Sequence, residues 1–243
     1  MIFAAGLGTR LYPHTVDRPK ALVEIAGKTL LQMAIEKVSA AGYDELIINI
    51  HHFGGQIIEF LQKNNYFGLT IHISDERDQL LDTGGGILKA KPFLDGAEPF
   101  LVYNVDVLSD IDLQLFRRYH LERGGMASLA VRDRKTSRYL VFDQSMQLSG
   151  WQNIHTGDKI VSHDVPNCNL LAFSGIQLIE PTIFKLISER GNFPLIPMYL
   201  RLAVNHPIFG YLDHSSVWMD LGKPDQMIAA EKYILNKKPD LTS

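Results

Sequence analysis

The chain of 243 residues has a single cysteine, Cys168, so it can form no intrachain disulfide and no zinc site built from several cysteines. It also has no uncharged hydrophobic run of about 18 residues, the length that a membrane-spanning helix needs. Neither sign of charge dominates, because 24 Lys and Arg residues stand against 27 Asp and Glu residues, a formal net charge of −3. We therefore expect neither nucleic acid nor a membrane surface as a partner.

Internal repeats and low-complexity segments are absent as well, and 46% of the residues are hydrophobic. This composition excludes disordered, collagen-like and coiled-coil proteins and suffices for a large buried core. The hydrophobic run at residues 1–5 is short and has no basic residues before it, unlike a signal peptide. We expect a cytoplasmic protein.

Short hydrophobic runs alternate with amphipathic segments in the first half of the chain. Strands are expected at residues 1–5, 45–50, 69–73, 100–104 and 128–132, and helices at 29–41, 56–62 and 113–121. Strands separated by helices predict right-handed βαβ units. The expected fold is therefore α/β, with an open, mostly parallel, doubly wound sheet of the Rossmann-like type.

The pattern changes after about residue 138. Short strands at 139–143, 147–151 and 169–173 follow one another without helices between them. Helices return at residues 181–188, 195–204 and 224–236, with a short strand at 208–212. No linker interrupts the chain, so we expect a single domain over residues 1–243, with a first half over 1–135 and a small mixed-strand lobe with closing helices over 136–243.

A glycine-rich loop directly follows the first strand. Gly6 and Gly8 let the backbone approach a ligand closely and direct amide groups toward phosphate oxygens. Arg10 and Lys20 are available to neutralise a polyanion there. The loop is not a dinucleotide fingerprint, because Leu11 occupies the place of the third glycine.

The spacing of this segment resembles the N-terminal signature of the nucleotide-sugar pyrophosphorylases, the sugar-1-phosphate nucleotidyltransferases. The matching residues, in order, are Gly6, Gly8, Arg10, Pro13, Thr15, Pro19 and Lys20. The resemblance implies transfer of a nucleoside monophosphate from an NTP to a sugar-1-phosphate, with release of pyrophosphate. It implies catalytic roles for Arg10 and Lys20 and nucleotide binding by Ala5, Gly6, Gly8 and Thr9. Residues 1–135 would then be the nucleotide-binding half and 136–243 the sugar-binding lobe.

Two carboxylates stand where the family carries its metal ligands. Asp106 follows the strand at 100–104, although Val105 replaces the usual glycine before it. Asp220 lies in a Trp-x-Asp-x-Gly-x-Pro context, with Lys223 where a threonine is common. The resemblance implies that Asp106 and Asp220 hold Mg²⁺, which favours one or two carboxylates together with substrate phosphates.

Three successive glycines, residues 84–86, predict a loop that lets a base or a sugar lie against bare backbone; a tight loop opening a helix is the alternative. By resemblance, Thr83 and Gly84 would contact the nucleotide. The sugar would be contacted by Gly85, Asn104, Asn153, Asn169 and Gly175. The lysine that many members use to hold the sugar phosphate is absent from residues 150–153.

Within the family, the short chain, the glycine triplet and the missing lysine look most like the N-acetylmuramate-1-phosphate uridylyltransferases of cell-wall recycling. The chain ends soon after Asp220, so we expect no β-helix acyltransferase domain. Mannose-1-phosphate guanylyltransferase is the alternative, because the glycine triplet does not choose between uracil and guanine. A regulatory homologue without turnover is disfavoured, since Arg10, Lys20 and both carboxylates are kept. Homo-oligomerisation is left open.

Overall fold

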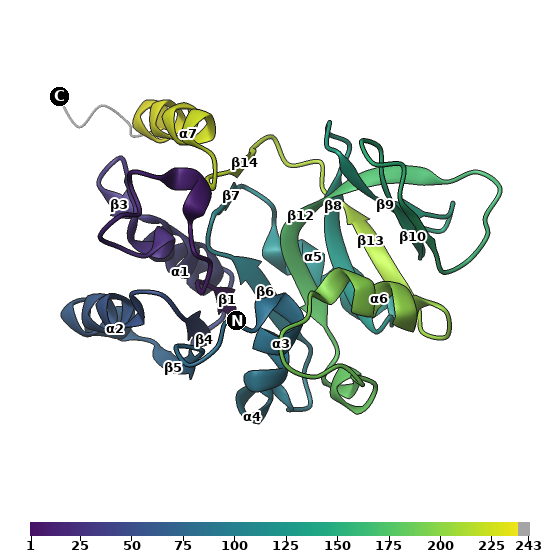
Figure 1. Cartoon of the computed structure of the whole chain (residues 1–243), viewed down its shortest axis with the longest axis horizontal. Helices are drawn as coiled ribbons and strands as arrows, with labels where there is room; N and C mark the ends of the chain where they lie inside the picture. Colours follow the sequence, from purple (N-terminus) through teal and green to yellow (C-terminus); the bar gives the residue numbers. More distant parts are fainter. Residues whose placement is uncertain (238–243) are drawn as a thin grey trace. The chain divides into compact units, whose positions relative to one another are not determined.

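The computed structural model describes residues 1–237 and divides into two compact units. Among the described residues, the first unit contains 1–80, 103–110 and 216–237, and the second contains 81–102 and 111–215. The colours of Figure 1 show that each unit joins segments distant in sequence. The expected division at residue 135 is therefore not where the contacts divide the chain.

The first unit is built on parallel strands in the order β6-β1-β4-β5. The bounds of its elements are β1 Ile2–Phe3, β2 Glu24–Ile25, β3 Lys28–Thr29, α1 Leu30–Ala40, β4 Glu45–Ile50, α2 Gly54–Lys63, β5 Thr70–Asp75, β7 Val107–Ser109, β14 Trp218–Asp220 and α7 Pro224–Lys237. Strand β6, Phe100–Asn104, contributes its last two residues to this unit. The parallel sheet confirms the predicted α/β class.

Helix α1 shows why local sequence fixes these elements. The side chain of Thr29 caps its first turn by accepting a hydrogen bond from the Gln32 amide at 3.0 Å. Leu31 and Ile35 are buried, so the face of the helix that carries them packs into the core. Gly42, just past the end, adopts a φ of +89°, a conformation that favours glycine.

The register of the parallel strands places four residues in one lateral row near the strand ends. Phe3 of β1 is paired with Asn104 of β6 on one side and Asn49 of β4 on the other. Asn49 is in turn paired with Ser74 of β5. In open α/β sheets, ligands bind beyond the carboxyl ends of the strands. Because Phe3 is the last residue of β1, the row lies at that end, directly before the loop that follows β1.

The second unit has mixed strands, as expected. Its elements are α3 Asp82–Lys89, α4 Lys91–Leu94, α5 Leu113–Arg123, β8 Ala127–Arg132, β9 Arg138–Phe142, β10 Leu148–Asn153, β11 Lys159–Val161, β12 Asn169–Ile179, α6 Leu195–Ala203 and β13 Ile208–Leu212. Strands β11-β10-β9-β12 are antiparallel, and β8 pairs with β12 antiparallel and with β13 parallel. Strand β12 runs six residues beyond its expected end at 173, and the helix expected at 181–188 is a 3-10 helix, Pro181–Lys185.

The expectation of an open loop at the glycine triplet is wrong. Residues 84–86 lie inside α3 and are buried. A Cβ on Gly84 would be 2.3 Å from the Phe193 ring, and one on Gly85 would be 2.2 Å from the Gly191 carbonyl oxygen. The glycines are required because they let α3 pack directly against the backbone of residues 191–193.

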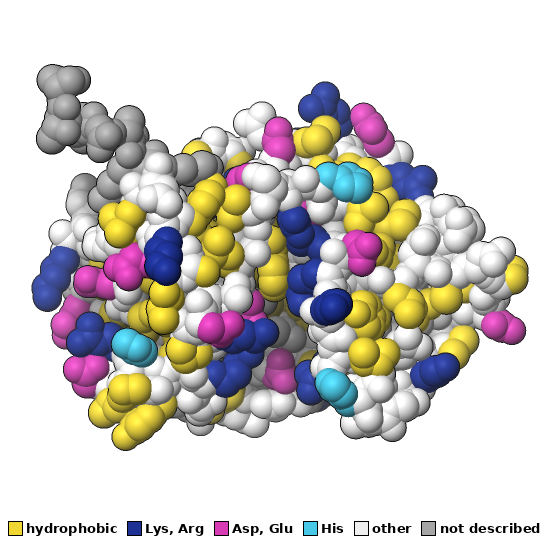
Figure 2. Space-filling model, turned by 90° about the horizontal axis from the view of Figure 1, so that it is seen from above, with side chains coloured by type: hydrophobic (Ala, Val, Ile, Leu, Met, Phe, Trp, Pro, Cys, Tyr) yellow, Lys and Arg dark blue, Asp and Glu magenta, His cyan; other side chains and the backbone are white. Residues whose placement is uncertain are grey.

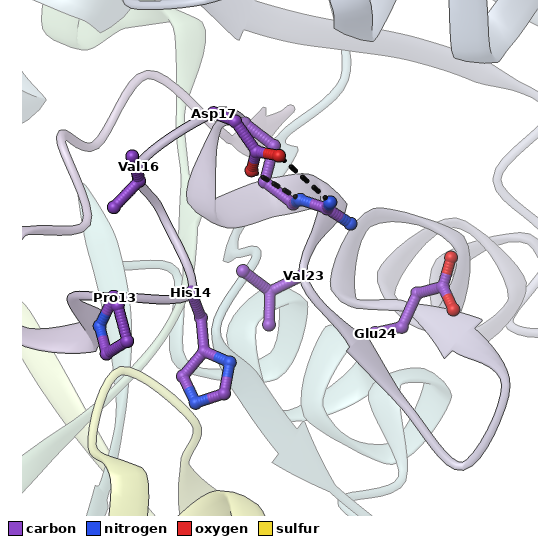
Figure 3. Close-up of a pocket in the computed structure, with 7 residues that line it drawn as sticks. Pro13, His14, Val16, Asp17, Val23 and Glu24 are labelled. Atoms are coloured by element: carbon purple, nitrogen blue, oxygen red, sulfur yellow. Dashed lines mark hydrogen bonds and ion pairs between the residues drawn. The ribbon is translucent and has the colours of Figure 1, made fainter.

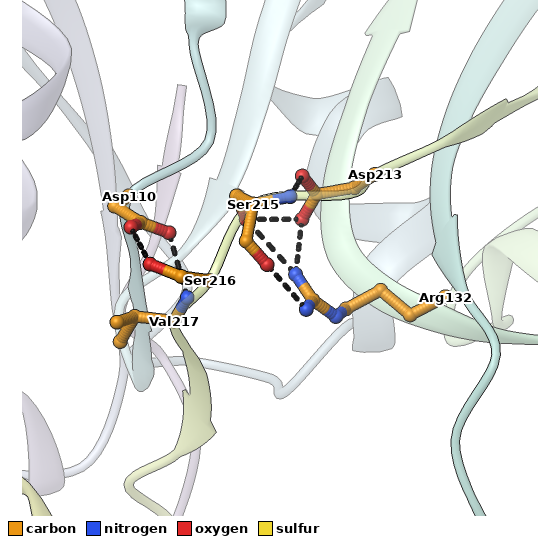
Figure 4. Close-up of polar contacts among 6 residues, drawn as sticks. All are labelled: Asp110, Arg132, Asp213, Ser215, Ser216 and Val217. Atoms are coloured by element: carbon orange, nitrogen blue, oxygen red, sulfur yellow. Dashed lines mark hydrogen bonds and ion pairs between the residues drawn. The ribbon is translucent and has the colours of Figure 1, made fainter.

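The chain passes from the second unit to the first between Ser215 and Ser216, and each side is held within its own unit (Figure 4). In the second unit, Arg132 donates to the Asp213 carboxylate at 2.7 Å and to the Ser215 carbonyl at 2.6 Å. In the first unit, the Asp110 carboxylate accepts from the Ser216 hydroxyl at 2.6 Å. The connection is therefore anchored on both sides by charge-assisted hydrogen bonds.

Acidic and basic side chains are interspersed on the face shown in Figure 2. That face carries no broad area of one sign, in keeping with the near balance of charges in the sequence. Among residues 1–237, no helix is both long enough and apolar enough to cross a bilayer.

Candidate active site

The loop after β1 is shaped by Gly8 and its neighbours. Gly8 has a φ of +66°, and its carbonyl accepts a hydrogen bond from the Thr15 hydroxyl at 3.0 Å. A Cβ at Gly8 would lie 2.9 Å from the Cβ of Lys20 and from the Cγ2 of Thr15. Only glycine fits this backbone and this contact, so the loop packs against the stem of Lys20.

Lys20 contacts both the glycine loop and Asp106, the first of the two candidate metal ligands. Its ammonium lies 2.7 Å from Oδ2 of Asp106, and the two side chains are only 14% and 13% exposed. The ammonium and the adjacent carbon of Lys20 would be 3.7 Å from a Cβ on Gly6. The positive charge is thus held beside the loop backbone, largely shielded from water, where it acts more strongly than at the surface.

Asp106 and Asp220 are brought together by the pairing of β7 with β14. The register places Asp220 opposite Val107, and the Leu221 amide donates to the Asp106 carbonyl at 2.7 Å. Two acids that are 114 residues apart in sequence (220 − 106) therefore become neighbours through a two-stranded ribbon.

Gly222 provides the space in which these charges converge. A Cβ there would be 2.9 Å from Oδ1 of Asp220, 3.0 Å from Oδ2 of Asp106 and 3.1 Å from Nη2 of Arg10. The absence of a side chain leaves a small cradle bounded by two carboxylates and a guanidinium. Arg10 is 62% exposed and makes only a loose ion pair with Asp220, 3.8 Å long, so most of its fork remains available to a ligand.

The donor set of this cradle fits a magnesium ion. No group of three or more His, Cys, Asp and Glu side chains suited to a metal occurs within residues 1–237. Asp106 and Asp220 supply two carboxylates on one space, and Mg²⁺ takes one or two carboxylates and completes its shell with water and phosphate oxygens. The two acids would therefore hold the ion only together with a phosphorylated substrate.

Comparison with known proteins identifies the family. Residues 1–150 match the Nucleotidyl transferase family. The N-acetylmuramate alpha-1-phosphate uridylyltransferase of Caulobacter vibrioides is 33% identical over 244 residues, covering 95% of this chain and 94% of that protein. The chain belongs to the Nucleotidyl transferase family.

Two further comparisons agree with the assignment. The protein of the same name from Neisseria meningitidis serogroup B is 33% identical over 222 residues, covering 91% of this chain and 92% of that protein. The structure of a UDP-glucose pyrophosphorylase from Acinetobacter baumanii has a TM-score of 0.79 at 17% identity, covering 99% of this chain and 94% of that one. At that identity it supports the fold of this nucleotidyl transferase, not its substrate.

Every catalytic and metal-binding residue expected from the sequence lies in the first unit of the nucleotidyl transferase. The structure brings Arg10, Lys20, Asp106 and Asp220 together around Gly222 and the glycine loop. Their roles stay predictions, but their proximity is a finding. Asn104 lies at the end of β6, in the lateral row described above.

Thr83, Gly84 and Gly85 lie in the second unit and are engaged there with residues 191–195. The Thr83 hydroxyl accepts a hydrogen bond from the Leu195 amide at 2.9 Å. The amides of Gly84 and Gly85 donate to the Phe193 carbonyl at 2.8 and 3.2 Å. These contacts give the three residues a packing role, and their contact with a base or a sugar stays a prediction.

The remaining sugar-site candidates of the second unit support local structure. Asn153 accepts a hydrogen bond from the His155 amide at 3.0 Å, and Asn169 donates to the Asp143 carbonyl at 3.2 Å. Gly175 has a φ of +78° where the register of β12 against β8 shifts. All three lie in the second unit, and their contact with a sugar stays a prediction.

The chain also forms an open hollow of about 480 Å³ beside the spacer of the signature (Figure 3). It is lined by Pro13, His14, Val16, Asp17, Arg18, Val23 and Glu24. The Arg18 guanidinium donates to the Asp17 carboxylate at 2.9 and 3.3 Å, and that bond lowers the pKa of the Asp17 carboxyl. None of the expected catalytic residues lines this hollow.

The sequence analysis does not identify two buried polar residues of the first unit, Asn49 and Glu76. Asn49 is 4% exposed and Glu76 is fully buried. The signal was present in the sequence, since an asparagine interrupts the hydrophobic run at residues 45–50 and a glutamate directly follows β5. Buried polar groups of this kind are hydrogen-bonded and carry a specific structural or functional role.

Proposed function

We propose that this nucleotidyl transferase transfers a uridylyl group from UTP to N-acetylmuramate α-1-phosphate and releases pyrophosphate, a reaction of cell-wall recycling. The class of reaction follows from the family. The choice of base and sugar is supported by two relatives of that name, each 33% identical over more than nine tenths of the chain. The cluster of Arg10, Lys20, Asp106 and Asp220 supports turnover rather than binding alone.

The proposed chemistry is an in-line displacement. An oxygen of the sugar phosphate attacks the α-phosphorus of UTP, the bond from that phosphorus to the α,β-bridging oxygen breaks, and pyrophosphate leaves. Such reactions depend chiefly on positioning and on neutralising charge. Arg10, exposed beside the glycine loop, would bind the β- and γ-phosphates, where negative charge grows.

Lys20 would bind the reacting phosphates from its largely buried position on Asp106. The pair orients the ammonium, because a carboxylate at 2.7 Å restricts the rotation of the lysine side chain. The amides of the loop at residues 6–9 would contact the phosphate chain, and Gly8 keeps that backbone in its left-handed turn.

Asp106 and Asp220 would hold Mg²⁺, which when bound supplies positive charge to the phosphate oxygens. The proposal does not require a protein base, because the attacking phosphate oxygen is already ionised at neutral pH. The protein then contributes placement and charge alone.

A screen of four NTPs against several sugar 1-phosphates, read by pyrophosphate release, tests the proposal. UTP with N-acetylmuramate 1-phosphate should give the highest kcat/KM. A preference for GTP with mannose 1-phosphate would overturn the base and sugar assignment while leaving the reaction class intact. Mg²⁺-dependent NTP binding without pyrophosphate release from any pair would instead identify a regulatory homologue.

A further inference from the structure

A hydrogen-bonded chain of buried groups lies beneath the glycine loop, entirely within the first unit. Oδ1 of Asn49 accepts hydrogen bonds from the amides of Ala4 at 2.7 Å and Ala5 at 3.3 Å. The side-chain amide nitrogen of Asn49 donates to Oε1 of Glu76 at 2.8 Å. The backbone of Glu76 is fixed in turn, since its amide donates to the Ile50 carbonyl at 2.8 Å.

The two amides that Asn49 binds are the first after β1, which ends at Phe3. Ala4 and Ala5 are 2% and 7% exposed, so their amides have little access to water. A buried amide without an acceptor is costly, and the backbone would turn to find another. Asn49 therefore sets the direction in which the chain leaves the sheet and enters the loop at Gly6.

Glu76 sets the orientation of the Asn49 amide group. An asparagine presents a donor on one side and an acceptor on the other, and the two can exchange by rotation. The NH₂ group of Asn49 donates to Oε1 of Glu76 at 2.8 Å, so the Glu76 carboxyl group holds the donor side of the amide toward itself. The carbonyl oxygen must then face Ala4 and Ala5, which only donate.

We propose that Asn49 and Glu76 are positioning residues for nucleotide binding, which hold the glycine loop in register with Lys20 and Asp106. The inference rests on the proposed function, because it assigns the loop to the triphosphate. The loop and the catalytic pair share contacts, since Gly8 packs on the stem of Lys20 and Gly6 lies beside its ammonium. A loop that leaves β1 at another angle would separate its amides from that charge.

Exchanging the two polar groups gives the sharpest test. Asn49→Asp keeps an acceptor for Ala4 and Ala5 but sets a carboxylate against Glu76. Adding Glu76→Gln restores a donor between the two positions and returns the pair to its original charge. Asn49→Leu removes the acceptor outright. Thr29→Ala is the control, because it removes a partly buried hydrogen bond of the same unit at the start of α1.

Dissociation constants for UTP with Mg²⁺, KM for the sugar phosphate and Tm are measured for each variant. Asn49→Asp and Asn49→Leu should weaken UTP binding about tenfold or more, with little change in KM for the sugar phosphate. The double variant should return to within about threefold of the original protein. Thr29→Ala should lower Tm without changing UTP affinity.

Three results would overturn the inference: UTP affinity within about twofold in Asn49→Leu, no recovery in the double variant, or a double variant that does not fold although its hydrogen bonds are preserved. Hydrogen exchange of the Ala4 and Ala5 amides provides a readout that needs no nucleotide. Exchange should be fast in Asn49→Leu and slow in the double variant. If the original protein turns over no substrate pair, the proposed function fails, while this exchange comparison still tests the positioning role.

Discussion

Lys20 and Asp106 form a largely buried ion pair, with side chains 14% and 13% exposed. Lys20→Met should lower kcat about a hundredfold, because it removes the charge that we propose binds the reacting phosphates and leaves Asp106 without this partner. Pyrophosphate release under saturating substrates measures the effect. Lys28→Met is the matched control, since Lys28 pairs with Glu36 at 2.6 Å on the surface; an equal loss there would contradict the assignment.

The two loop glycines should respond differently to a methyl group. Gly8→Ala should reduce the free energy of unfolding by about 1–2 kcal/mol or more, because its φ of +66° disfavours a side chain and the Cβ would lie 2.9 Å from Lys20 and Thr15. Gly6→Ala should stay within about 0.5 kcal/mol, since its Cβ would meet Lys20 at an ordinary 3.7 Å. Urea unfolding compares the two, and equal losses would show that the loop is not packed as described.

His120 gives the second unit a pH-dependent stability. Its ring is buried between the Ser128 hydroxyl at 2.9 Å and the Glu180 carboxylate at 3.1 Å, and burial lowers its pKa, an effect that Glu180 only partly opposes. The unfolded chain, with a histidine pKa of about 6.5, then binds more protons on acidification. Stability should be fully present above about pH 6.5 and decrease below it, by at most about 1.4 kcal/mol per pH unit.

Urea unfolding between pH 7.5 and 5.5 measures this dependence. His120→Gln should show a shallower decrease over the same range, because the group that takes up the proton is gone. Parallel curves for the two proteins would assign the pH dependence to other groups.

Among the elements, α3 is the one whose sequence most directly reflects its packing. Gly84→Ala should reduce the free energy of unfolding by about 1–3 kcal/mol, since the added carbon would lie 2.3 Å from the Phe193 ring. Gly96→Ala is the control in the same unit, because no atom lies within 4 Å of its added carbon. Thermal unfolding compares them, and an unchanged Tm for Gly84→Ala would contradict the close packing.

Elements with local signals were predictable from the sequence. Strands β4 and β6 match their expected bounds, and α1, Leu30–Ala40, lies within its expected range of 29–41, because the hydrophobic patterns that predict them are local. The glycine triplet was misjudged, since the same lack of side chains serves an open loop and a tight packing contact. Its partner Phe193 is far along the chain, and no short-range pattern indicates it.

In the candidate site, too, some features could be predicted from the sequence and others could not. Arg10 and Lys20 were expected as site residues because the signature around them resembles that of the family, and the structure places both beside the glycine loop, while their roles stay predictions. The geometry that joins them to Asp106 and Asp220 depends on the β7–β14 ribbon, a long-range pairing of two three-residue strands that has no sequence signal. Asn49 and Glu76 were missed because burial, which gives a polar residue its importance, is not visible in a single sequence.

For the molecule as a whole, substrate should stabilise the fold much more when the metal is present than when it is absent. UTP with Mg²⁺ at about a hundred times its dissociation constant should raise Tm on the order of 5–10 °C. UTP with a chelator should give a much smaller shift, because the carboxylates of Asp106 and Asp220 would then repel the triphosphate. Asp220→Asn should reduce the Mg²⁺-dependent part of the shift, and an unchanged increment would contradict the two-carboxylate site.

The division into interleaved units determines which parts of the protein can assemble first during synthesis. The chain crosses between the units four times, at 80/81, 102/103, 110/111 and 215/216. The second unit is therefore fully synthesised while the first still lacks β14 and, with it, Asp220. On the ribosome, Asp106 and Asp220 cannot come together until the polypeptide has grown past residue 220, so the proposed metal site forms among the last steps of maturation.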